Sequence, residues 1–140
     1  MELVNGRPFD VQGLPKWKSS ATKGRRGRLI SPRESAGESS YEDSVAKAYS
    51  DIYGAKKPFM SRVCVTIFVY LPTPKSKSPH RSGKPSLDRM TKTVMGGLRK
   101  ASVWENESQV SHITSIKAYS DSPHIHVDIS EIMESPWNQG

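Results

Sequence analysis

The segment from Ser86 to Val110 reads SLDRMTKTVMGGLRKASVWENESQV and contains the clearest helical pattern in the chain. Its apolar residues recur at the spacing of one helix face: Leu87, Met90, Val94 and Leu98. Serine is a preferred residue at a helix start, so Ser86 is expected to open this helix. The pair Gly96-Gly97 lies inside it, although each glycine costs about 1 kcal/mol relative to alanine. Such a pair suggests close packing against another backbone.

The segments on both sides of this helix are expected to form strands. Arg62 to Leu71 is β-branched and aromatic on both faces, which predicts a central strand covered on both sides. Val110 to Tyr119 and His124 to Ile129 predict two further strands, joined by a turn over residues 120–123. The last residues, Ser130 to Gly140, carry weak order signals and are expected to form a loose tail.

A second helix is expected between Ser40 and Tyr53, with Ser39 or Ser40 as its cap and Gly54 as its stop. Its predicted core stripe consists of Tyr41, Val45, Ala48, Tyr49 and Ile52. The predicted order is strand, basic arm, helix, strand, basic loop, helix, strand, strand. Such an order indicates a mixed α/β layout with short sequential β connections.

Length and composition favour one basic domain spanning residues 1–140. Only 34% of the residues are hydrophobic and 25% are charged, so flexible segments or a core completed by a partner subunit are expected. Cys64 is the only cysteine, which excludes an intrachain disulfide and a zinc–cysteine cluster. No apolar stretch approaches the length of a membrane span, and the first residues do not resemble a signal peptide. A cytoplasmic location is therefore expected.

The net charge of +7 and the pI near 9.6 favour a polyanionic partner, chiefly nucleic acid. Much of this charge lies in two polar segments, a basic arm at about residues 15–33 and a basic loop at residues 72–85. The candidate DNA-binding residues are Lys16, Lys18, Lys23, Arg25, Arg26 and Arg28 in the arm, and Lys75, Lys77, Arg81 and Lys84 in the loop. The arm holds no acid, so phosphate binding is favoured over a merely solvated tail.

Four charged residues near the first helix form a candidate metal-dependent phosphodiesterase site, namely Asp88, Lys92, Glu105 and Glu107. Carboxylates can hold Mg²⁺ or Mn²⁺, which activates water and neutralises a phosphate. A nearby lysine can stabilise the charge of the transition state. The pattern alone also fits an ordinary ion pair between residues four apart on a helix.

The row His124, His126 and Asp128 on the last predicted strand offers a second set of metal-binding side chains. We interpret it as the solvent-facing side of that strand. Trp104, which precedes the acids, is expected to pack the hinge between helix and strand.

Two parts of this region resemble the RusA family of Holliday-junction resolvases. Lys84 to Lys92 is similar to the family's Pro-Asp-Leu-Asp-Asn motif and the lysine that follows it. Val103 to Val110 is similar to the family's Trp-x-Asp-Asp-x-Gln-Val motif, and the spacing between the two motifs agrees without a gap. The stretches Pro15–Lys18 and Arg28–Pro32 also resemble the basic N-terminal region of that family.

The resemblance implies an α+β fold, a mixed and largely antiparallel sheet flanked by helices, assembled as a homodimer. It implies an endonuclease that uses Mg²⁺ or Mn²⁺ to nick opposing strands of a four-way DNA junction. DNA recombination, repair or the processing of phage DNA would be its setting, since members of the family occur in phages and prophages.

The resemblance also assigns roles to individual residues. Asp88 matches a metal-site aspartate, Lys92 the catalytic lysine, and Glu107 the third essential carboxylate. Asn106 matches the first acid of the acidic pair, and Gln109 the polar residue beside it.

Two departures from the family pattern keep a rival hypothesis open. Ser86 stands where the first metal-site aspartate belongs, and Gly96 replaces a helix aspartate. Ser86 would then contribute only a hydroxyl group or a water to the metal, with Glu105 as a substitute carboxylate. The rival is a homologue with a decayed site that binds junction or duplex DNA without cutting it. An RNA-binding module is a third hypothesis, which the expected lack of an aromatic platform on the sheet disfavours.

Overall fold

The computed structural model describes residues 2–14, 32–73 and 86–133, with the backbone alone for residues 32–39. The expected order of elements is confirmed across these ranges. The elements are β1 (Glu2–Gln12), α1 (Pro32–Tyr53), β2 (Val63–Leu71), α2 (Leu87–Lys100), the short 3₁₀ helix η2 (Glu107–Gln109), β3 (Val110–Tyr119) and β4 (His124–Met133). None of the described helices is both long and apolar enough to cross a membrane.

The four strands form one mixed sheet in the order β1-β4-β2-β3. Only the β2–β3 pair is parallel, whereas β4 pairs antiparallel with both β1 and β2. The predicted fold class, α+β with a largely antiparallel sheet, is therefore confirmed. Because β2 lies inside the sheet and β1 at its edge, the parallel pair is reached through the crossover that contains α2.

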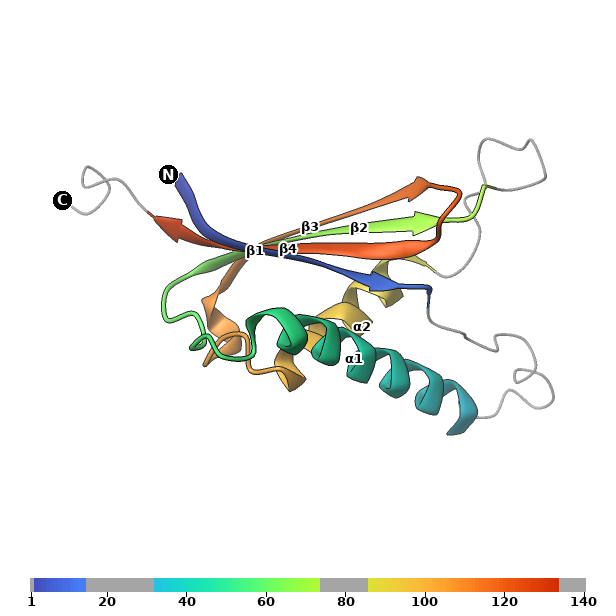
Figure 1. Ribbon diagram of the computed structural model, residues 1–140, viewed down its shortest axis with the longest axis horizontal. Coiled ribbons are helices and arrows are strands. Elements are labelled where there is room, and N and C mark those ends of the chain that lie inside the picture. The colour runs from blue at the N-terminus through green and yellow to red at the C-terminus, as the bar shows by residue number, and fades with distance from the viewer. Residues whose placement is uncertain (1, 15–31, 74–85, 134–140) are drawn as a thin grey trace.

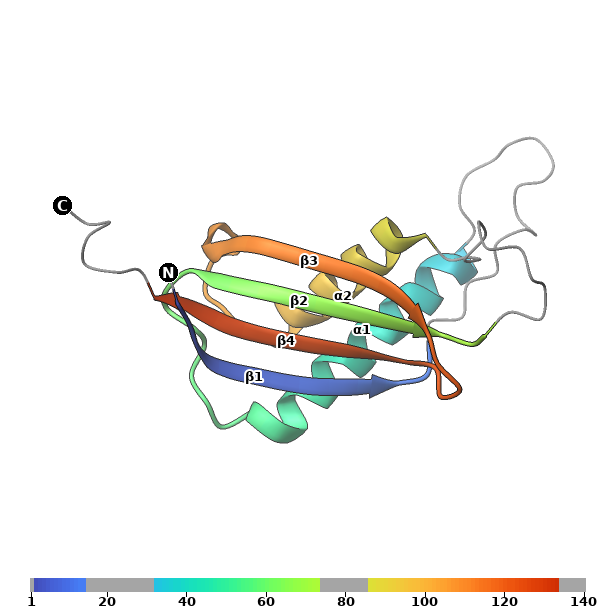
Figure 2. The same cartoon turned by 90° about the horizontal axis from the view of Figure 1, so that it is seen from above.

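Both helices lie on the same side of the sheet (Figures 1 and 2). One face of β2 is buried under them, with Val63, Val65, Ile67 and Val69 all fully buried. The alternate residues Thr66, Phe68 and Tyr70 remain partly exposed. The prediction that β2 is covered on both sides is thus wrong for the described part of the chain, because α1 and α2 occupy a single layer.

The side of the sheet that faces away from the helices is called the open face below. Residues that pair directly in neighbouring strands point to the same side of a sheet, which assigns the open-face residues from the register. They are Pro8, Asp10 and Gln12 of β1, Thr66, Phe68 and Tyr70 of β2, Thr114, Ile116 and Ala118 of β3, and His124, His126 and Asp128 of β4.

The long helix α1 begins earlier than expected, at Pro32 instead of after Ser39 or Ser40. Proline suits the first helical position because its fixed φ angle is already helical. The predicted end before Gly54 is confirmed, and Gly54 donates its backbone N–H to the Ser50 carbonyl at 2.8 Å. Ile52, predicted to be in the core, is 60% exposed, and Tyr53 packs against the core instead.

The second helix, α2, has the predicted start and apolar face. Ser86 caps it by accepting a hydrogen bond from the Arg89 N–H at 3.2 Å, and Met90, Val94 and Leu98 are fully buried. A Cβ atom on Gly97 would lie 2.5 Å from the Val45 Cβ atom. The close approach expected from the glycine pair is therefore confirmed, and it fixes the spacing between α1 and α2.

The last strand extends beyond its predicted end. Glu131 to Met133 pair with Glu2 to Val4 of β1, so β4 continues to Met133. The prediction of a loose tail from Ser130 is wrong for these residues, because pairing with the distant N-terminal strand orders them. Residues 134–140 lie outside the described ranges.

Candidate functional site

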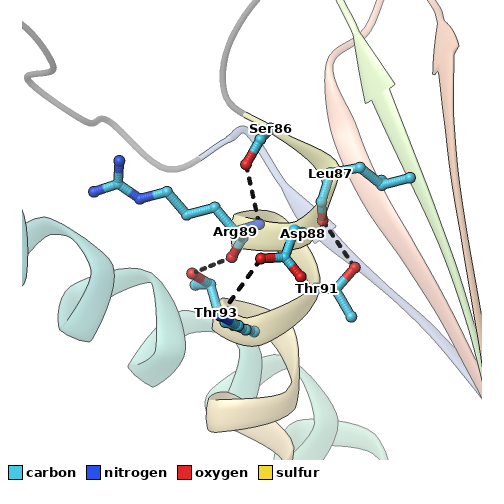
Figure 3. A network of polar contacts seen from close by, with 7 residues as sticks. Ser86, Leu87, Asp88, Arg89, Thr91 and Thr93 are labelled. Carbon is cyan, nitrogen blue, oxygen red and sulfur yellow. Dashed lines mark hydrogen bonds and ion pairs between the residues drawn. The ribbon is translucent and has the colours of Figure 1, made fainter.

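The first turn of α2 carries two exposed, oppositely charged side chains (Figure 3). The side chains of Asp88 and Lys92 are 80% and 78% exposed, and Lys92 Nζ lies 3.4 Å from Asp88 Oδ2. They are four residues apart on the helix, so they share one face. Ser86 lies just before them, and its Oγ atom is engaged in the helix cap. The structure thus brings Ser86, Asp88 and Lys92 to one end of α2.

This end of α2 is attached to the sheet by two hydroxyl groups. Thr91 Oγ1 donates a hydrogen bond to the Leu87 carbonyl at 2.9 Å and lies 2.7 Å from Ser115 Oγ in β3. Since the single Thr91 hydroxyl proton points to Leu87, Ser115 is the donor to Thr91. Lys117 follows Ser115 by two residues and therefore lies on the same, helix-facing side of β3. Sequence reasoning missed these residues, because nothing in their local pattern indicates which helix they face.

Glu107 lies at the other end of α2, where both of its carboxylate oxygens are engaged. Oε1 accepts a hydrogen bond from Arg99 Nε at 2.8 Å, and Oε2 accepts one from the Trp104 indole N–H at 3.1 Å. Trp104 is 5% exposed, so the prediction that it packs between helix and strand is confirmed. Arg99 gave no signal in the sequence as a partner of Glu107.

Gln109 organises the turn that holds Glu107. Its side-chain oxygen accepts hydrogen bonds from the backbone N–H groups of Glu105 and Asn106, at 2.9 and 2.8 Å. Its side-chain nitrogen donates to the carbonyls of Phe59 and Ser61, at 2.8 and 2.9 Å. The polar residue next to the acids therefore ties the turn to the segment that leads into β2. The side chain of Glu105 belongs to this turn and not to the end of α2 that carries Asp88.

The two predicted metal carboxylates are consequently far apart within one chain. Arg99, which contacts Glu107, follows Asp88 by eleven residues on α2, a distance of about 16 Å along a helix axis. Ligand oxygens around Mg²⁺ or Ca²⁺ lie within about 2.6 Å of the ion. Among the described residues there is also no group of three His, Cys, Asp or Glu side chains arranged to hold a metal ion. These residues of a single chain therefore do not fit a site in which Asp88 and Glu107 share a cation.

The histidine row lies on the open face, as predicted for the outer side of the last strand. His126 Nδ1 lies 2.7 Å from Asp10 Oδ1, and the His124 ring stacks on Tyr70 with centroids 4.6 Å apart. Phe68 lies beside them, with ring centroids 6.1 Å from Tyr70. The expectation that the sheet has no aromatic platform is wrong, because the alternation of β2 places both Phe68 and Tyr70 on its uncovered side.

The ten predicted DNA-binding lysines and arginines all fall in residues 15–31 or 74–85, outside the described ranges. Their role stays a prediction. The start of α2 follows the second of these segments directly, so the basic loop and the Asp88–Lys92 pair are neighbours in the chain.

Comparison with known proteins assigns the chain to a family. A family model described as endodeoxyribonuclease RusA matches residues 8–130, which is most of the 140-residue chain. No curated protein matches the chain significantly.

Proposed function

The chain belongs to the RusA family of endodeoxyribonucleases, and from this premise we propose that it is a metal-dependent endonuclease that nicks branched DNA, four-way junctions in particular. The observation that supports a reaction centre at the start of α2 is the exposed Asp88–Lys92 pair. It lies at a helix N-terminus, whose backbone N–H groups and dipole favour a phosphate. We place its action on cellular or phage DNA in the cytoplasm, during recombination, repair or phage DNA processing.

In this proposal, side chains around the start of α2 bind and orient the scissile phosphate. Lys92 would stabilise the negative charge that builds on the phosphate in the transition state. Asp88 would be a carboxylate ligand of Mg²⁺ or Mn²⁺, the cation that supplies an activated water and charge neutralisation in this class of reaction. The basic arm and loop would contact the DNA backbone, which gives affinity without reading the base sequence. A homodimer would provide two such centres.

Glu107 enters the reaction centre on the family match alone, since its oxygens are bound by Arg99 and Trp104. In the described chain its visible contribution is to hold the turn before β3. Glu105, Asn106 and Gln109 contribute to the same turn.

Cleavage of a labelled four-way junction by the purified protein, with Mg²⁺, Mn²⁺ or EDTA, tests the proposal. Asp88→Asn should abolish metal-dependent nicking while the junction is still bound. The matched control is Asp51→Asn, because Asp51 also forms an exposed ion pair with a lysine four residues away on a helix, at 2.9 Å from Lys47. Cleavage by Asp88→Asn at the parent rate would refute the assignment.

A third variant, Glu107→Gln, tests the family match at that position. Loss of nicking with an unchanged melting temperature would assign Glu107 to the reaction centre. Normal nicking would leave it as an anchor of the turn.

The second candidate function is junction or duplex DNA binding without cleavage. The position of Ser86 favours it, because a cap serine stands where the family has a carboxylate and Asp88 is left as the only acid in the first turn of α2. Titration calorimetry with Mn²⁺ and Mg²⁺ separates the two functions. Stoichiometric uptake that is lost in Asp88→Asn supports the nuclease, whereas tight junction binding with no cation uptake and no nicks supports the binder.

A further inference from the structure

The open face leaves a broad apolar and aromatic surface without a covering layer among the described residues. Ile116 is 42% exposed there, and Phe68, Tyr70 and two histidines form a continuous row of rings. Figure 1 shows that both helices lie on the opposite side of the sheet. A central strand that is apolar on both faces is typical of a sheet with both faces covered. The strand β2 has this composition but only one covered face.

The charge of the open face argues against DNA as the cover. The chain contains 21 lysines and arginines, yet none of the twelve open-face residues is a lysine or an arginine. Two of them, Asp10 and Asp128, are acids. A surface that binds DNA phosphates is expected to concentrate basic residues. The aromatic row could stack on bases, but the acids beside it would repel the backbone that carries those bases.

We propose that the open face is the surface on which a second copy of this chain docks, sheet against sheet. This assignment rests on the proposed function only for the existence of a dimer, and it adds the surface that forms it. In a two-fold symmetric pair the same face is used by both copies, so the apolar residues of one copy meet those of the other. The face also carries complementary polar groups, since His126 and Asp10 already pair at 2.7 Å within one copy.

The size of the open face fits a stable dimer. Four strands about 4.8 Å apart and about ten residues long, at about 3.3 Å per residue, form a sheet of about 600 Å² in flat projection. The accessible area of a corrugated side-chain surface is larger than its projection. A specific interface of standard size buries about 800 Å² per partner, so most of this face would need to take part.

The proposed arrangement places both α2 helices on the outside of the dimer, away from the contact. Each Asp88–Lys92 pair would then face outward on its own copy and remain accessible to DNA. The basic segments next to α2 would likewise lie outside the contact.

Sedimentation velocity of the full-length protein tests the proposal with two matched variants on the same strand. Ile116 and Ile113 are 42% and 44% exposed, but Ile116 belongs to the open face and Ile113 to the helix-facing side of β3. We expect the parent protein and Ile113→Asp to sediment as dimers at micromolar concentration. We expect Ile116→Asp to sediment as a monomer, with a circular dichroism spectrum that shows it is folded.

Three results would overturn the proposal: a monomeric parent protein, a dimeric Ile116→Asp, or a monomeric Ile113→Asp. If Ile116→Asp stays dimeric but loses junction binding, the open face contacts DNA instead. The readout is mass and not cleavage, so failure here leaves the nuclease assignment intact. Conversely, an inactive Asp88→Asn dimer would leave this assignment unaffected.

Discussion

Replacing the two adjacent glycines of α2 one at a time by alanine should have opposite consequences. A Cβ atom on Gly97 would lie 2.5 Å from Val45 Cβ and 2.8 Å from the backbone carbonyl oxygen of Glu42. Val45 is fully buried, and neither of these atoms can move by a side-chain rotation. A Cβ atom on Gly96 would meet only the end of the Glu42 side chain, whose carboxylate carbon lies 2.6 Å away.

The expected magnitudes follow from these contacts. Glycine to alanine within a helix contributes about 1 kcal/mol of stability. At residue 97 an overpacking cost of about 1–3 kcal/mol opposes it, so we expect a net loss of about 1–2 kcal/mol in Gly97→Ala. At residue 96 the Glu42 carboxylate can rotate away and lose only a partly exposed ion pair with Lys100. Gly96→Ala should therefore equal or slightly exceed the parent protein in stability.

Urea denaturation followed by circular dichroism measures both variants against the parent, and thermal melts provide an independent check. A loss of about 1.5 kcal/mol corresponds to a fall of about 6 °C in melting temperature for a domain of this size. Equal stabilities of the two variants, or a Gly97→Ala protein more stable than the parent, would refute the close approach of α1 and α2 at this point.

Three further changes test the site and the sheet. Ser86→Asp keeps a good helix cap, so stability should change by less than about 0.5 kcal/mol, while Mn²⁺ affinity measured by calorimetry should rise; unchanged affinity would count against a cation site at this helix end. Glu107→Gln should cost less than about 1 kcal/mol in urea denaturation, because its ion pair with Arg99 is half exposed; a larger loss would mean that the turn depends on this charge. The hydrogen bond from Ser61, the largest cause, holds the pKa of Glu131 below its ordinary value. The carboxylate therefore stabilises the fold above the ordinary glutamate pKa, and that contribution is lost as the pH falls through the folded-state pKa. Glu131→Gln should be less stable than the parent at neutral pH and lose less stability on acidification, and parallel stability curves for the two proteins would contradict this.

Local sequence patterns were sufficient for most of the secondary structure. The α2 helix was predictable from its cap serine and from apolar residues that repeat with the helical period, and β2 from its run of β-branched residues. These signals lie within a few residues of one another, so the sequence carries them without knowledge of the fold. The family motifs around Asp88 and Glu107 were legible for the same reason, and the family match over residues 8–130 agrees with them.

Features that depend on residues distant in the chain were decided by the tertiary structure. The first turns of α1 show no apolar periodicity, and the end of β4 is ordered only by pairing with β1. The placing of both helices on one side of the sheet could not be read from β2, because an apolar strand looks the same whether its cover comes from its own chain or from another.

The candidate site shows the same division between local and distant information. The sequence determined which residues are candidates for chemistry, through the spacing of Ser86, Asp88 and Lys92 on one helical turn. It did not determine the distance between Asp88 and Glu107, which are close in sequence terms but lie at opposite ends of a rigid helix that rises about 1.5 Å per residue. Only the packed helix, and the contacts of Arg99 and Trp104 with Glu107, decided that one chain holds these two carboxylates apart.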